Sequence, residues 1–150
     1  MPMTLKTQPN LWDYEPPPVV AEFDPDEVRG KNLAARLSMA ISKALSTVEA
    51  SRAQIAARMT GFLGGPPVTK AMLDAYAAQS RPDHSISVPR FVALLHATQD
   101  RRLAQMLVEG LGWAVIEKKY LPLIEVAELR EQEDRIRRRV KTLTAQAGRR

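Results

Sequence analysis

Proline and glycine are placed so that they cut this chain into short windows. Six of the 11 prolines fall within the first 25 residues, and the glycines gather at positions 61–65 and 110–112. Both residue types destabilise a helix when they lie in its interior. The windows between them carry apolar residues three and four positions apart, the spacing of one face of a helix. The pattern predicts an all-α fold of short helices, preceded by an extended, acidic, proline-rich arm at residues 1–23.

Five short helices are expected within residues 24–112, because each window opens on a typical start signal. Asp24 followed by Pro25 indicates the first start, and Ser51 with Gln54 three residues later is a capping-box pattern for the second. The remaining starts are expected at Thr69, at Ser87 or Val88, and at Asp100. The glycine- and proline-rich stretch 61–67 is expected to separate the second helix from the third.

Two further segments follow this helical domain. Residues 113–121 include the β-prone run WAVIEKKY, which predicts either a short strand or an extended connector. Residues 122–147 contain no glycine. Residues 118–150, which include Lys118 and Lys119, contain ten basic residues. Residues 122–150 predict a long, basic, amphipathic C-terminal helix.

The composition excludes most catalytic and metal chemistry. The chain has no cysteine and two histidines, which removes disulfides, zinc knuckles and thiolate nucleophiles. We therefore expect a binding protein and not an enzyme, with no cofactor and no metal. No apolar run approaches the roughly 18 residues of a membrane span. We expect no membrane association and a cytoplasmic location.

Charge is distributed unevenly along the chain. Residues 1–28 contain six acidic residues and one lysine, whereas residues 29–150 contain 21 basic and 11 acidic residues. A basic body favours a polyanionic partner such as double-stranded DNA, although a merely solvated basic surface is the alternative. The acidic arm carries Trp12, Tyr14 and Phe23. It is expected to lie along the body, to bind a protein partner, or to remain a free tail.

The second and third predicted helices fit the requirements of a helix-turn-helix. Such a pair needs a small residue where the two backbones approach, and inward apolar residues three apart on the second helix. Ile55 and Ala56 meet the first requirement, and Leu73 and Tyr76 meet the second. An ordinary helical bundle in which these residues are only core is the alternative.

The stretches SRAQIAARM, VTKAMLDAY and VPRFVALLHAT resemble the lambda-repressor-like helix-turn-helix domains, over about Ser38–Gly112. The resemblance implies a five-helix bundle whose helix at residues 69–79 reads the major groove. The chain departs from the family at TGFLGGPP, which makes the expected turn about eight residues longer. The expected DNA-binding residues are Arg52, Gln54, Thr69, Lys70, Ala71, Asp74, Ala75, Ala78 and Gln79. The whole arrangement is also similar to small regulatory proteins of Mu-like transposable phages, which implies a transcriptional regulator or an accessory DNA factor.

The C-terminal helix carries a heptad seam. Its a and d positions are Val126, Leu129, Glu133, Ile136, Val140 and Leu143. Such a seam is typical of a coiled coil and predicts a homodimer. Two alternatives remain open: the helix packs on its own domain, or its arginines contact the DNA backbone directly. A helical protein–protein adaptor, acting through the coiled coil or the arm without touching DNA, is the alternative function.

Overall fold

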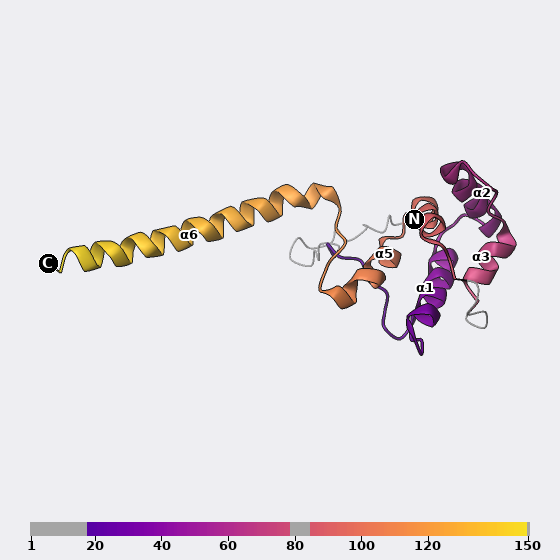
Figure 1. Cartoon of the computed structure of the whole chain (residues 1–150), viewed down its shortest axis with the longest axis horizontal. Helices are drawn as coiled ribbons and strands as arrows, with labels where there is room; N and C mark the ends of the chain where they lie inside the picture. The colour runs from indigo at the N-terminus through magenta and orange to yellow at the C-terminus, as the bar shows by residue number, and fades with distance from the viewer. Residues whose placement is uncertain (1–17, 79–84, 150) are drawn as a thin grey trace, which may run out of the picture. The chain divides into compact units, whose positions relative to one another are not determined.

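The computed structural model describes residues 18–78 and 85–149, and every regular element among them is helical. The elements in chain order are α1 (Leu33–Thr47), α2 (Arg52–Leu63), α3 (Lys70–Tyr76), α4 (Val88–Thr98), α5 (Arg101–Val108), the 3-10 helices η2 (Glu109–Leu111) and η3 (Lys118–Tyr120), and α6 (Leu121–Ala147) (Figure 1). The prediction of an all-α fold with a long C-terminal helix is confirmed. The chain divides into two units, Met1–Val115 and Ile116–Arg150.

The first unit is built around one apolar core. α2 packs mainly against α4, while α1 contacts α5 and α3. The fully buried large side chains come from all five helices and are Ile41, Ile55, Met59, Leu73, Leu94 and Leu103. No helix contributes more than two of them, so the core depends on the whole set packing together.

Local capping explains where most of these helices begin. Ser51 accepts a hydrogen bond from the backbone N–H of Gln54, and the Gln54 side chain accepts one from the N–H of Ser51. Thr69 accepts from the N–H of Met72, and Asp100 accepts from the N–H of Arg102. These bonds satisfy amides that the helix itself leaves free. The starts predicted at positions 51, 69, 87 and 100 are confirmed.

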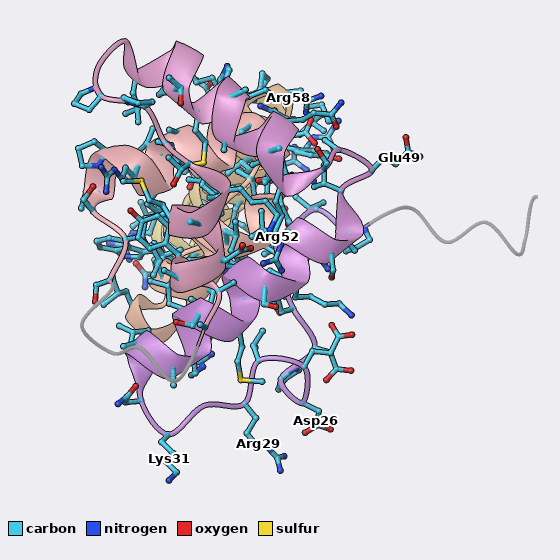
Figure 2. The ribbon with its side chains drawn as sticks, turned by 90° about the vertical axis from the view of Figure 1, so that its right-hand side faces the viewer. Asp26, Arg29, Lys31, Glu49, Arg52 and Arg58 are labelled. Atoms are coloured by element: carbon cyan, nitrogen blue, oxygen red, sulfur yellow. The ribbon has the colours of Figure 1, made fainter. Side chains whose placement is uncertain are left out.

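The start predicted for the first helix is wrong. Asp24 does accept the backbone N–H groups of Asp26 and Glu27, but these bonds close a turn and not a helix. α1 begins later, at Leu33, and is capped by Asn32. A Cβ on Gly30 would lie 2.6 Å from the backbone nitrogen of Arg36, so only glycine lets the chain pass so close to the first turn of α1. Figure 2 shows Asp26, Arg29 and Lys31 on this loop, at the opposite end of the view from Arg58.

The break predicted from Gly61 starts too early. α2 continues through Gly61 to Leu63 and ends where Gly64 adopts a left-handed backbone, with φ of 63°. The connection to α3 is therefore Gly64–Thr69, shorter than the sequence predicted. Thr60 closes it, because its hydroxyl donates to the carbonyl of Ala56 and accepts the N–H of Val68 at 2.9 Å.

The described end of the N-terminal segment packs on the core of the first unit. Phe23 and Val28 are 8% and 3% exposed. The guanidinium of Arg102 lies 4.4 Å from the centre of the Phe23 ring. Of the alternatives for the arm, residues 19–23 follow the one in which it lies along the body. Trp12 and Tyr14 lie outside the described residues.

Gln105 on α5 links the segment before α1 to the segment after η2. This side chain is 3% exposed, and its oxygen accepts the N–H of Val115 at 2.7 Å. Its amide nitrogen faces the Glu22 carboxylate and the Trp113 carbonyl, at 3.4 and 3.5 Å. Residues 113–117 form no strand, so the extended connector is the alternative that the structure contains.

Candidate nucleic-acid interface

The contact between the first residue of α2 and the helix α3 brings three of the predicted interface residues together. Arg52 and Lys70 are the first residues of their helices, and Asp74 lies one turn into α3. The Arg52 guanidinium contacts Oδ1 of Asp74 at 2.5 Å, and the Lys70 ammonium contacts Oδ2 at 2.9 Å. One carboxylate therefore holds two cations side by side, and the three side chains retain one net positive charge.

Both oxygens of Asp74 are engaged, which sets its role in the cluster. Its side chain is 39% exposed, against 62% for Lys70 and 34% for Arg52. The hydrogen bonds from Lys70 and then Arg52 hold the pKa of the Asp74 carboxyl below its usual range. A lowered pKa means that the fold favours the charged form. The contribution of this carboxylate to stability is present above the pKa of the unfolded chain and is lost as the pH falls through the folded pKa.

A carboxyl titration followed by nuclear magnetic resonance checks this arrangement. We expect Lys70→Met to raise the pKa of Asp74 towards its ordinary value, because the mutation removes one of the two cations that donate hydrogen bonds to the carboxylate. Lys31→Met, which removes a lysine from the loop before α1, should leave the Asp74 titration unchanged. An unchanged midpoint in Lys70→Met would show that the contact between Lys70 and Asp74 does not form in solution.

The other predicted interface residues separate into four groups. Gln54, Thr69 and Ala71 are exposed, although the Gln54 oxygen is used in the capping box. Ala78 is half-buried, and Gln79 lies outside the described residues. Ala75 is 9% exposed, so the prediction that it faces outward is wrong. α3 packs on both α1 and α2, which leaves a seven-residue helix with little free surface.

Two arginines outside the cluster, on α2 and α4, were not singled out by sequence reasoning. Arg90 of α4 donates to the Tyr76 hydroxyl at 2.7 Å and so ties the end of α3 to α4. Arg58 of α2 is exposed, and Figure 2 shows it well apart from Arg52 on the same helix. Its guanidinium reaches the carbonyl of Ala97 at 3.4 Å. Tyr76 and Arg90 are 14 residues apart, and no local pattern predicts such a pair.

The predicted dimerisation residues all lie on α6. In the second unit, none of the helix's residues is buried. The exposed fractions of its seam residues are 44% for Val126, 56% for Leu129, 65% for Ile136, 56% for Val140 and 47% for Leu143. Glu133 pairs with Arg137 of its own helix at 2.7 Å. The helix therefore presents an apolar stripe that its own unit does not cover.

Within residues 18–78 and 85–149, no group of three or more histidine, aspartate or glutamate side chains is placed to hold a metal ion. No helix in the described part of the chain has the length and apolar character needed to cross a membrane. No protein-family model, curated protein or solved structure matches this chain.

Proposed function

We propose that this chain is a DNA-binding protein with a lambda-repressor-like helix-turn-helix, in which residues 69–79 enter the major groove and the start of α2 meets the phosphate backbone. The observation that carries the proposal is the pair of cations, Arg52 at the start of α2 and Lys70 at the start of α3, that Asp74 holds together. Arg52 and Lys70 open two successive capped helices and meet at Asp74. Positive side chains at these two helix starts suit an approach to phosphate, which dominates affinity for DNA.

Asp74 acts in this proposal as a holder of cations and not as a reader of bases. Its carboxylate keeps Arg52 and Lys70 together in the free protein. A DNA phosphate that binds them must compete with that carboxylate. The exposed residues nearest the groove are then Thr69, Lys70 and Ala71, which offer a hydroxyl, an ammonium and a methyl group. Such groups suit contacts with phosphate, guanine and the thymine methyl.

The test measures binding to duplex DNA by fluorescence anisotropy over a series of salt concentrations. We expect Lys70→Glu to weaken binding and to lower the slope of log K against log salt by about 1, the loss of one phosphate contact. Lys31→Glu makes the same charge change on the loop before α1 and should leave both quantities nearly unchanged. Asp74→Asn should tighten binding, because both cations are released to phosphate.

Two results would count against this proposal. Equal losses from Lys70→Glu and Lys31→Glu would reduce the interaction to attraction by net charge. Absence of binding by the unmodified chain, including to duplexes selected from random sequence, would reject DNA binding altogether. A sequence preference that survives high salt, in contrast, would support base reading by residues 69–79.

The biological role that we propose follows from this activity. A small groove-reading protein that resembles regulators of Mu-like transposable phages would act as a transcriptional regulator or an accessory DNA factor. Its place of action would be the cytoplasm, where bacterial and prophage DNA is found. Transcription profiling after its expression in a bacterial host would test the regulatory part of the proposal.

A second candidate function, a protein–protein adaptor, is favoured by an apolar strip on the first unit. Val88 and Val92 lie one turn apart on α4 and are 76% and 44% exposed. Phe62 of α2 is 47% exposed and stacks on His96, one further turn along α4, with ring centres 4.4 Å apart. Exposed apolar residues that are contiguous suit a protein partner. If the adaptor role is correct, the unmodified chain should bind no DNA, and Val92→Asp should abolish binding of the protein partner.

A further inference from the structure

The apolar stripe of α6 has the regularity of a coiled-coil seam. The helix is 27 residues long, and its stripe alternates at three- and four-residue steps from Val126 to Leu143. A helix whose residues are all outside a core gains little from propensity alone. A strict seven-residue repeat matches the surface of an identical helix that supercoils with it. A second copy of this chain is therefore the occupant that fits.

Most of the residues at the seam favour a parallel coiled coil of two helices. The a positions carry Val126, Glu133 and Val140, and the d positions carry Leu129, Ile136 and Leu143, so both apolar a residues are β-branched and two of the three d residues are leucine. Branched residues at a with leucine at d favour parallel dimers over trimers and tetramers. We propose that α6 forms a parallel, in-register, two-stranded coiled coil with a second copy of this chain.

Charges beside the seam support the parallel orientation. In parallel helices, Glu125 at g faces Arg130 at e of the second copy, so two attractive pairs form. In antiparallel helices aligned over the same seam, Arg130 faces Arg137 of the second copy, so two repulsive pairs form. The seam flanks are therefore complementary to themselves in one orientation and repulsive in the other.

Glu133 is the weak layer of this coiled coil. It occupies an a position, so two carboxylates meet at the middle of a parallel dimer. Each is balanced by Arg137 of its own helix, which contacts it at 2.7 Å. A polar residue at a single a position lowers stability and fixes the register, because any shift would leave it against an apolar layer. The dimer is thus expected to be in register and reversible.

The first experiment measures self-association of the full chain by sedimentation over a wide range of concentrations. We expect a monomer–dimer equilibrium in the unmodified chain. Glu133→Leu should tighten it by at least about tenfold, since each chain then buries an apolar side chain in place of a carboxylate. Glu131→Leu is the matched control: it also removes a glutamate paired with an arginine four residues on, but at the outward f position. Its association should be unchanged.

The second experiment determines orientation and uses the absence of native cysteine. Leu143→Cys places a thiol at a d position, which faces the same residue of the second copy only in a parallel dimer. Mild oxidation should therefore give a disulfide-linked dimer, whereas Ala145→Cys at the outward f position should not. Cross-linking between Val126→Cys and Leu143→Cys chains, without linkage of Leu143→Cys to itself, would overturn the parallel arrangement.

If both the unmodified chain and Glu133→Leu stay monomeric at every concentration, the proposal of a dimer is rejected. The apolar stripe of α6 would then be covered in another way. The inference does not rest on DNA binding. Lys70→Glu, which tests the interface on the first unit, should leave self-association unchanged. Glu133→Leu should leave the slope of log K against log salt for DNA binding unchanged. Failure of one proposal is therefore distinguishable from failure of the other.

Discussion

Leu73→Ala is expected to cost about 2–5 kcal/mol of unfolding free energy, the range measured when a buried leucine leaves a cavity. Leu73 is the one side chain of α3 with 0% exposure, and it lies in the same core as Ile55 of α2. Because small domains are stable by about 5–15 kcal/mol, this single change removes a large share of the total. Urea denaturation followed by far-ultraviolet circular dichroism gives the value.

The same substitution at an exposed position provides the control. Leu33 is the first residue of α1 and is 58% exposed, so Leu33→Ala should change stability by less than about 0.5 kcal/mol. Leu73→Ala should also weaken any DNA binding, since α3 would lose its main attachment. A small cost for Leu73→Ala would show that α3 is held by contacts other than its core residue.

Phe23→Ala is expected to cost about 3 kcal/mol or more, because a buried phenylalanine is lost together with its contact to Arg102. The Arg102 guanidinium over the ring is itself held by Asp100 at 2.7 Å and by the hydroxyl of Thr47 at 3.0 Å. The Arg102 side chain is therefore held in place and cannot move to fill the space that Phe23→Ala would leave. Thermal and urea unfolding of the full chain measure the cost.

Two companion variants separate the causes. Phe23→Leu keeps most of the buried apolar surface and should lose mainly the ring–guanidinium attraction, about 0.5–1 kcal/mol. Val19→Ala changes a residue of the same segment that is 43% exposed and should be nearly neutral. If Phe23→Ala proves as mild as Val19→Ala, residues 18–28 do not belong to the folded core.

The sequence predicted helix starts well, because the signals are local. Ser51, Thr69 and Asp100 each bond to an amide two or three residues away, so the pattern and the contact lie within one turn. Asp24 shows the limit of such signals. Its local bonds form as expected, but they close a turn at residues 25–28 and no helix follows until Leu33, after Gly30 has passed close to the first turn of α1.

The sequence assigned Arg52, Lys70 and Asp74 to one candidate interface, but it did not predict that Asp74 pairs with both cations. Arg52 and Asp74 are 22 residues apart, and nothing in their local sequence indicates that they pair. Ala75 was expected outside because its neighbours suggested a single buried stripe. α3 contacts both α1 and α2, and Ala75 is only 9% exposed, so more of this helix is covered than one apolar stripe.

The buried amide of Gln105 decides how this protein can be shortened. A fragment that ended before Val115 would strand a polar oxygen away from water, and one that began after Glu22 would remove a partner of the nitrogen. An unpaired polar group in such a place costs about 1–3 kcal/mol. Any truncated version intended for structural work should therefore retain at least residues 22–115, although the regular helices occupy a narrower span.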